Sequence, residues 1–285
     1  MSIITISRGC YSHGKEIAEH VAAALGYECI SREVVLEASR FFNIPETRLT
    51  WSIHHAPSLL ERIIHPQAHQ HYLDCIQAAL LEHVKNDNVV YHGGAGHLFL
   101  TGIRHVLRVR VIAEMQDRVD LVCKMRKIPR TEAITLIEAE DRQREEWYHS
   151  VYKKDISDPR LYDMLLHIGR LTIDDAIELI CATAARESFK PTARSMEDLN
   201  DRALLSHVKT VLTKLCEADV AVAGGVVTVK VKGQKLRDTG FTRPGMQQRV
   251  QTRMQEDLRQ EITALVSKIP GVKDLICEIG SPYYA

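Results

Sequence analysis

The stretch that decides the fold of this chain is Ile3-Ile4-Thr5-Ile6-Ser7-Arg8-Gly9-Cys10-Tyr11-Ser12-His13-Gly14-Lys15. Its first four residues form a short, mostly β-branched apolar run, which is typical of a buried strand in a parallel sheet. Residues 9–15 fit the G-x-x-x-x-G-K spacing of a phosphate-binding loop, and residues 17–25 carry apolar positions at helical spacing before Gly26. A strand, a glycine loop and a helix in this order predict a nest of backbone amides for phosphate oxygens.

The residue after Lys15 departs from the standard motif. A serine or threonine there would hold Mg²⁺, but the chain has Glu16, whose carboxylate repels a triphosphate unless a metal ion or an arginine intervenes. Ser12 or an acidic residue elsewhere would then hold the metal, so the metal ligand stays open. The alternative is a glycine turn without a ligand. We favour phosphate binding because the strand, the glycines, the lysine and the helix occur together.

Strands and helices alternate along the first part of the chain. Helices are predicted at 34–42, 72–84, 115–126 and 131–150, and strands at 89–91 and 106–112, whereas 43–71 is less regular. This alternation predicts an α/β fold in three layers, with a parallel sheet between helices.

The composition changes after residue 186, and the low periodicity of 187–198 predicts a linker. Beyond it the expected order is a helix at 199–216, strands at 219–223 and 226–231 joined by Gly224-Gly225, an exposed loop at 233–245, a helix at 246–268 and a strand at 272–279. The sequence therefore predicts a phosphate-binding α/β domain over residues 1–186 and a small α+β domain over residues 199–285.

The overall composition limits the classes of function. Hydrophobic residues make up 45% of the chain, enough to fill a core, and 37 Lys+Arg balance 37 Asp+Glu. Because this leaves no global positive field, we expect no nucleic-acid partner. The N-terminus lacks a signal-peptide pattern, no apolar run is long enough to cross a bilayer, and the seven cysteines form no C-x-x-C pair. We therefore expect reduced thiols and a cytoplasmic location.

Several segments in the right order resemble the cytidylate-kinase-like family of P-loop kinases over about residues 1–185. Ile4–Arg8 with Ser12–Ala18 is similar to that family's Ile-Ser-Arg strand and Ser-Gly-Gly-Arg-Glu-Ile loop, where a glutamate also follows the basic residue. The further matches are Ser31-Arg32-Glu33, Val89–Leu100, Asp141, Arg144, Tyr148, Tyr152, Leu161-Tyr162-Asp163 and Gly169-Arg170-Leu171. The chain departs from the pattern at Ser31, Gly93 and His13, where the family has Asp, Arg and Gly.

The resemblance implies an ATP-dependent phosphotransferase of the nucleoside-monophosphate-kinase type, with ATP and Mg²⁺ as cofactors and a nucleotide or another small phosphate acceptor as its partner. The implied cofactor-binding residues are Arg8, Gly9, Ser12, His13, Gly14, Lys15 and Glu16. The implied catalytic residues are Lys15 and the arginines of a mobile lid, Arg126, Arg130, Arg142 and Arg144. Lid arginines would stabilise charge on the transferring phosphoryl group, but arginines paired with glutamates on a solvated helix face explain the pattern equally well.

Two alternatives remain open. Loss of the family's arginine at position 93 removes a contact to the acceptor phosphate, which favours a weak or inactive nucleotide-binding regulator that signals through the C-terminal domain. A structural protein that binds no nucleotide is the third hypothesis.

The C-terminal part resembles a BON domain from Leu204 to Ile279, through Gly224–Val229 and Ile269–Val272. This resemblance implies a small ligand or a lipid at this domain. A packing or dimerisation unit, and hence a homo-oligomer, explains the pattern as well.

Two smaller features complete the set of candidates. The crowding of His54, His55, His65, His69 and His71 indicates either a metal site or a surface without such a role. Cys10 lies beside a helix N-terminus, where its thiolate would be favoured, or it is a small filler residue.

Overall fold

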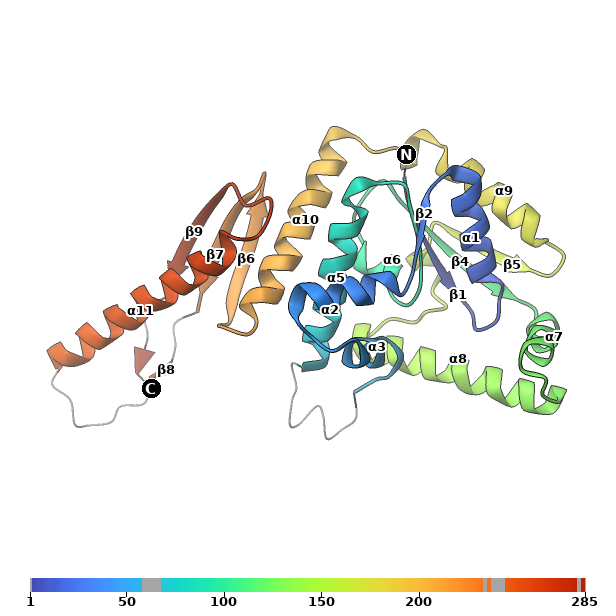
Figure 1. Cartoon of the computed structure of the whole chain (residues 1–285), viewed down its shortest axis with the longest axis horizontal. Helices are drawn as coiled ribbons and strands as arrows, with labels where there is room; N and C mark the ends of the chain where they lie inside the picture. Colours follow the sequence, from blue (N-terminus) through green and yellow to red (C-terminus); the bar gives the residue numbers. More distant parts are fainter. Residues whose placement is uncertain (1, 58–67, 233–234, 237–243, 281–282, 285) are drawn as a thin grey trace. The chain divides into compact units, whose positions relative to one another are not determined.

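The computed structural model describes residues 2–57, 68–232, 235–236, 244–280 and 283–284 (Figure 1). The chain divides into two compact units, Met1–Met196 and Glu197–Ala285. The division falls inside α10 (Ala193–Leu212), which begins within the segment that the sequence predicts as a linker.

The first unit is built on a five-stranded, fully parallel sheet. Its strands are β1 (Ile3–Arg8), β2 (Glu28–Ile30), β3 (Val89–His92), β4 (Val106–Ala113) and β5 (Met164–Ile168), in the order β2-β3-β1-β4-β5. This confirms the predicted α/β fold. The chain builds the sheet first to one side of β1 and then to the other, so the carboxyl end of β1 lies at the switch point where open α/β sheets bind ligands.

Helices cover both faces of this sheet. They are α1 (Gly14–Leu25), α2 (Glu33–Phe42), α3 (Glu46–His54), α5 (Ala68–His83), α6 (Gly96–Phe99), α7 (Met115–Arg126), α8 (Arg130–Tyr152) and α9 (Ile173–Ala184), with 3-10 turns at Val84–Asn86, Pro159–Leu161 and Glu187–Phe189. On one face, Ile4 and Ile6 of β1 pack with Ile17 and Val21 of α1 and with Ile180 of α9. On the other side lie α5 and α6, whereas α3 and α8 lie beyond the carboxyl ends of the strands (Figure 1). This end of the sheet therefore has helices around it that can wall a site.

The predicted helices and strands of this unit are confirmed to within a few residues, but the irregular segment at 43–71 is not. Its first part forms α3, and α5 begins at Ala68. Leu49 and Ser52 of α3 are buried, and the indole of Trp147 donates a hydrogen bond to the Ser52 carbonyl at 2.7 Å. Packing of this short helix against α8, which periodicity does not show, stabilises it. Residues 58–67 lie outside the described part.

The second unit contains a mixed three-stranded sheet in the order β6-β7-β9. β6 (Ala218–Ala223) runs antiparallel to β7 (Val226–Val231), and β9 (Asp274–Ile279) runs parallel to β7. Its core joins residues of α10, of the sheet and of α11 (Pro244–Val266), among them Val208, Val229 and Ile262. A separate pair joins β8 (Lys235–Leu236) to β10 (Tyr283–Tyr284). The small α+β unit of the predicted fold class is thus confirmed.

The elements of this unit differ from their predicted bounds most at the first helix. The helix expected at 199–216 spans Ala193–Leu212, because Ser195 and Thr192 exchange hydrogen bonds that start it earlier. The Gly224-Gly225 hairpin is confirmed, with φ of 57° and 85°, which glycine adopts without strain. Most of the loop expected at 233–245 lies outside the described residues.

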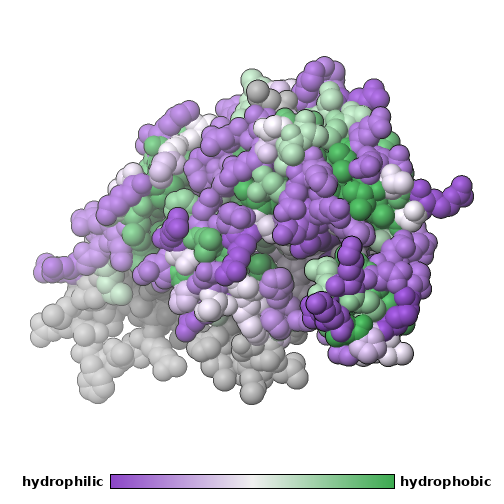
Figure 2. Space-filling view, turned by 45° about the vertical axis from the view of Figure 1, so that its right-hand side comes forward, coloured by the Kyte–Doolittle hydropathy of each residue, from purple (hydrophilic) through white to green (hydrophobic). Residues whose placement is uncertain are grey.

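Hydrophilic side chains cover most of the face shown in Figure 2, and hydrophobic groups are scattered among them. The large exposed hydrophobic residues, such as Phe41, Met125 and Met254, come from distant parts of the sequence. No helix in the described part of the chain is both long enough and apolar enough to cross a membrane.

Candidate phosphate-binding site

The loop between β1 and α1 makes a tight turn that requires a small residue at position 14. A Cβ atom added to Gly14 would lie 2.5 Å from the Cβ of Arg8, closer than real Cβ contacts allow. Tyr11 and His13 have left-handed backbones, with φ of 56° and 61°, and the His13 ring lies 2.9 Å from the Glu16 carboxylate. Left-handed residues in such a turn point successive amides toward one side, at the positive end of α1.

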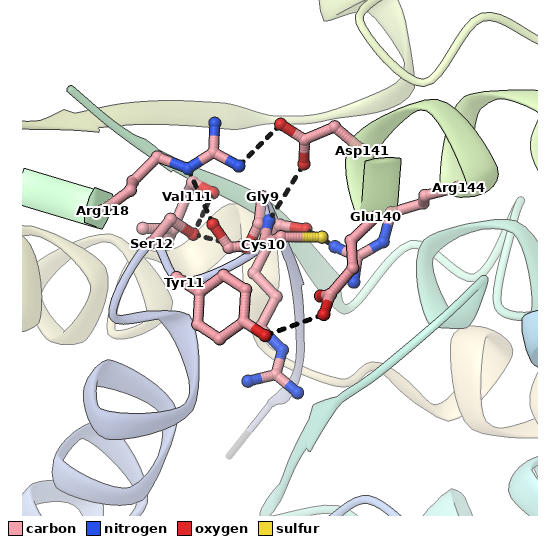
Figure 3. Close-up of polar contacts among 10 residues, drawn as sticks. Gly9, Cys10, Tyr11, Ser12, Val111, Arg118, Glu140, Asp141 and Arg144 are labelled. Carbon is pink, nitrogen blue, oxygen red and sulfur yellow. Dashed lines mark hydrogen bonds and ion pairs between the residues drawn. The ribbon is translucent and has the colours of Figure 1, made fainter. Parts of the chain in front are cut away.

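Ser12 fastens this loop to the sheet. Its hydroxyl lies 2.9 Å from the Gly9 carbonyl and 3.0 Å from the Val111 carbonyl, and the Gly9 amide donates to the same Val111 carbonyl (Figure 3). The side chain is 1% exposed. Its hydroxyl hydrogen is thus engaged by backbone, and the burial of Ser12 limits the access of a metal ion to its oxygen.

Lys15 points into solvent. Its side chain is 62% exposed, and its ammonium lies 3.6 Å from the Glu19 carboxylate, one turn along α1. Lys15 does not line the cavity described next. Its predicted grip on a nucleotide stays a prediction, which the length of its flexible stem permits.

A cavity of about 630 Å³ lies beside the loop, at the carboxyl ends of β1 and β3. Its polar lining consists of Ser7, Arg8, Ser31, Arg32, Thr50, His54, His55, Glu140, Gln143 and Arg144, and its aromatic lining of Tyr91, Trp147 and Tyr148. Among these described lining residues Glu140 is the single carboxylate, against three arginines. The charge of the wall therefore favours an anionic ligand.

Arg8 and Arg144 bring two of these charges together. The Arg144 guanidinium donates a hydrogen bond to the Arg8 carbonyl. Burial, and then the charge of Arg144, lower the pKa of Arg8. In the described part of the chain no carboxylate forms an ion pair with either guanidinium. A half-buried pair of like charges is stabilised when an anion binds between or beside it.

The other predicted lid arginines are not among the residues that line the cavity. Arg126 bonds to the Tyr11 hydroxyl at 2.6 Å and pairs with Glu140 at 3.4 Å, and Arg130 pairs with Asp120. Arg142 is exposed on α8. Arg126 therefore contacts the loop through Tyr11, whereas Arg130 pairs on a charged helix surface, and Arg144 is the one of the four predicted lid arginines that lines the cavity.

Arg118 of α7 is a residue that the sequence analysis missed. Its Nε donates to the Cys10 carbonyl at 2.7 Å, and its Nη2 donates to Asp141 of α8 at 2.6 Å (Figure 3). The second oxygen of Asp141 accepts the Cys10 amide at 3.4 Å. The available signal was an arginine in the first turn of the helix after β4, the strand beside β1, but no motif marks it.

The missing arginine at position 93 has a packing explanation. A Cβ added to Gly93 would lie 2.7 Å from the Tyr91 hydroxyl, and one added to Gly96 would lie 2.3 Å from the Tyr91 ring. Tyr91 therefore fills the space in which a side chain at position 93 would begin. The positive charge on this wall comes instead from Arg8, Arg32 and Arg144.

Of the two alternatives for Cys10, the structure favours the small filler over the thiolate. Burial raises the pKa of this thiol to about 12, and the nearby charge of Arg144 does not offset it. Cys10 is therefore the small buried filler of the loop. For the histidine cluster, His65 lies outside the described residues, and no three His, Cys, Asp or Glu side chains elsewhere in the described part gather as metal ligands.

A model of the cytidylate kinase-like family matches residues 3–170, more than half of the chain. The chain belongs to this family. The match covers the sheet, the loop and α8, and it ends before the second unit.

Individual relatives of this cytidylate kinase-like chain are distant. A uronate isomerase from Corynebacterium glutamicum is 28% identical over 102 residues, which are 36% of this chain and 20% of that protein, so the chain spans about a fifth of this curated relative. An uncharacterized protein from Eubacterium ventriosum is 17% identical with a TM-score of 0.48, covering 65% of this chain and all of that one. Shikimate kinase from Bacteroides thetaiotaomicron is 11% identical with a TM-score of 0.38, covering 64% of this chain and 97% of that one. A gluconokinase from Sinorhizobium meliloti is 14% identical with a TM-score of 0.39, covering 66% of this chain and 93% of that one.

Proposed function

We propose that this chain is an ATP-dependent phosphotransferase that resembles nucleoside-monophosphate kinases and acts on a small anionic acceptor. The observation that carries the proposal is the Arg8–Arg144 pair, which faces a cavity directly beside the glycine loop without an acidic partner among the described residues. Two guanidinium groups at such a place suit the phosphate of an acceptor, which Arg binds with paired hydrogen bonds.

The residues of the loop fit a polyphosphate. Gly14 leaves no space for a side chain, and the amide of Cys10 already binds a carboxylate, which is an oxyanion like phosphate. ATP would supply the transferable phosphoryl group, and the loop amides with Lys15 would hold it. For Mg²⁺ the fit is less direct, because Ser12 is buried and Glu16 replaces the usual hydroxyl. The metal ligand therefore stays open between Ser12 and an acidic residue elsewhere.

The surrounding helices would position the acceptor and exclude water. Gln143 of α8 donates to the His54 carbonyl at 3.0 Å, and Trp147 donates to the Ser52 carbonyl at 2.7 Å, so α8 and α3 form one wall. Arg144 projects from this wall and would bind the acceptor anion, and then the charge that develops during transfer. The other predicted site residues, Gly9 and His13, would shape the loop around the donor.

A turnover screen tests this proposal. The full chain is incubated with ATP, Mg²⁺ and each nucleoside monophosphate in turn, and ADP release is measured. We expect turnover with at least one acceptor, reduced about a hundredfold in Arg144→Gln and strongly in Lys15→Ala. Arg104→Gln is the matched control, because Arg104 is exposed before β4, at the opposite end of the sheet. Absence of turnover with every acceptor, or equal rates for wild type and Lys15→Ala, would contradict the proposal.

The second candidate is a nucleotide-binding regulator without catalysis. It is favoured by Lys15, whose ammonium pairs with Glu19 and lies outside the cavity. Calorimetry separates the two candidates, because tight binding of ATP without any product supports the regulator.

We propose that the second unit is a BON-like domain. The proposed boundaries of the two domains are 1–186 and 199–285. The role of the second unit would be to bind a small ligand or lipid, or to form a homo-oligomer. Cosedimentation of the full chain with phosphatidylglycerol vesicles tests the lipid, and light scattering tests the oligomer.

A further inference from the structure

The carboxylate of Asp141 lies against a backbone amide of the loop between β1 and α1. One oxygen accepts the Cys10 amide at 3.4 Å, and the other accepts Arg118 at 2.6 Å (Figure 3). Arg118 also donates to the Cys10 carbonyl at 2.7 Å, so it is fixed on the loop independently of Asp141. The three groups form a closed triangle that joins the loop, α7 and α8.

The two contacts of Asp141 are unequal. At 3.4 Å the bond from the Cys10 amide is longer than the usual range for N–H···O bonds, whereas the bond from Arg118 is short and charge-assisted. The Arg118 side chain is 11% exposed and that of Asp141 is 31% exposed. An arginine buried against the loop, together with an amide that lacks a good acceptor, forms a subsite for an oxyanion that can approach more closely than Asp141.

We propose that the Cys10 amide and Arg118 form a phosphate subsite, and that Asp141 occupies it in the ligand-free chain. This inference rests on the proposed function and deepens it. A phosphate oxygen of the nucleotide displaces the carboxylate, accepts the Cys10 amide and takes over the Arg118 guanidinium. Arg118 is then a nucleotide-binding residue, and Asp141 is an internal competitor that lowers the affinity for nucleotide.

Displacement of Asp141 leaves α8 attached to the loop. Glu140 accepts the Tyr11 hydroxyl at 2.7 Å, and Arg144 donates to the Arg8 carbonyl. These contacts lie on either side of Asp141 along α8, so the carboxylate can leave the loop by a change of rotamer while the helix stays in place.

Calorimetry with a non-hydrolysable ATP analogue and Mg²⁺ tests whether Asp141 competes with the nucleotide for the subsite. We expect Asp141→Asn to bind the analogue about tenfold more tightly than wild type, because a charged group no longer competes for the subsite. Glu145→Gln removes the same charge from an exposed position on α8 and should change the affinity less than about twofold. Unchanged or weaker binding by Asp141→Asn, with wild type still binding, overturns the inference and leaves the proposed function intact. Asp141→Ala repeats the test if the first variant does not fold.

A double variant tests Arg118 directly. In the Asp141→Asn variant Arg118 no longer forms an ion pair with residue 141. Any loss of affinity for the analogue on adding Arg118→Gln therefore reports the contact of Arg118 with the ligand. We expect about a tenfold loss of affinity for the analogue. If the double variant binds as tightly as Asp141→Asn, Arg118 is not part of the subsite. If wild type and all variants fail to bind the analogue, the proposed function fails and this inference fails with it.

Discussion

The loop after β1 and the Gly224-Gly225 hairpin each have a helix carboxylate on their backbone amides, and they hold it differently. At the Gly224-Gly225 hairpin, Asp201 of α10 accepts both glycine amides, at 2.7 and 3.0 Å. In the loop after β1, Asp141 accepts the single amide of Cys10 at 3.4 Å and relies on Arg118 for its second contact. Asp201 therefore acts as a structural cap, whereas Asp141 can be replaced by another oxyanion.

The charges around the two turns explain this difference. At the hairpin, Asp201 meets two neutral amides, and the nearby Lys273 ammonium donates to the Gly224 carbonyl. Beside the loop, Arg8 and Arg144 face a cavity without an ion-pair partner among the described residues. Backbone amides of a turn thus indicate ligand binding where positive charge is in excess, and indicate a structural role where a carboxylate already satisfies them.

The largest expected effect is a loss of stability of the first unit as the pH falls. In the unit that carries the loop, burial and then the charge of Arg8 lower the pKa of His92 to about 4, and burial followed by two arginine charges lowers that of His97 to about 3. Between about pH 6.5 and pH 5 these histidines bind protons in the unfolded chain but stay neutral in the folded unit. The free energy of unfolding of this unit therefore falls as the pH falls. We expect a loss of about 2 kcal/mol for each histidine.

Tryptophan fluorescence during urea unfolding measures this loss selectively, because Trp51 and Trp147, the two tryptophans of the chain, both lie in the first unit. His97→Phe keeps the ring that stacks on Tyr148 and should flatten the pH slope. An unchanged slope would contradict the assignment. His83 affects the pH dependence in the opposite direction, because hydrogen bonds with two glutamates outweigh burial and raise its pKa. Comparing the pH slopes of wild type and His97→Phe therefore isolates the contribution of His97.

The next effect compares two glycines of the loop. Gly14→Ala places a methyl group against Arg8 and should displace the loop by enough to weaken nucleotide binding about a hundredfold. At Gly9 the nearest atom to an added Cβ is the Cβ of Ser12 at 3.6 Å, which is ordinary contact. Gly9→Ala is therefore the matched variant, with a much smaller expected loss. Equal losses in calorimetry would show that the tight approach at Gly14 does not shape the site.

The smallest effect tests the cap on the hairpin. Asp201→Ala leaves the amides of Gly224 and Gly225 without their acceptor and should lower the stability of the β6–β7 hairpin by about 2 kcal/mol. Hydrogen exchange of the β6 and β7 amides measures this change. Asp198→Ala, at an exposed position on the same helix, should leave the exchange rates unchanged. Equal exchange in both variants would mean that Asp201 is no more a cap than Asp141.

The sequence predicted most elements where hydrophobic periodicity was strong. It missed α3, whose apolar pattern is short and interrupted, because the helix depends on burial of Leu49 and on a hydrogen bond from Trp147, 95 residues after Ser52. It left Cys10 open between a thiolate and a small filler residue, and burial, which raises the pKa of this thiol to about 12, favours the filler. Local pattern predicts local structure well, but it carries no information on which distant groups desolvate a side chain.

By itself the sequence determined the strand, glycine loop and helix at the N-terminus, the parallel α/β fold, and the hairpin of the second unit. These depend on spacing and on backbone freedom, which a chain carries locally. The tertiary structure decided which charges meet: it brought Arg144 to Arg8, and Arg118 and Asp141 to the amide of Cys10, across separations of more than 100 residues. Charge pairing and burial act through space, so the choice of Arg144 among the four predicted lid arginines became visible only in the folded chain.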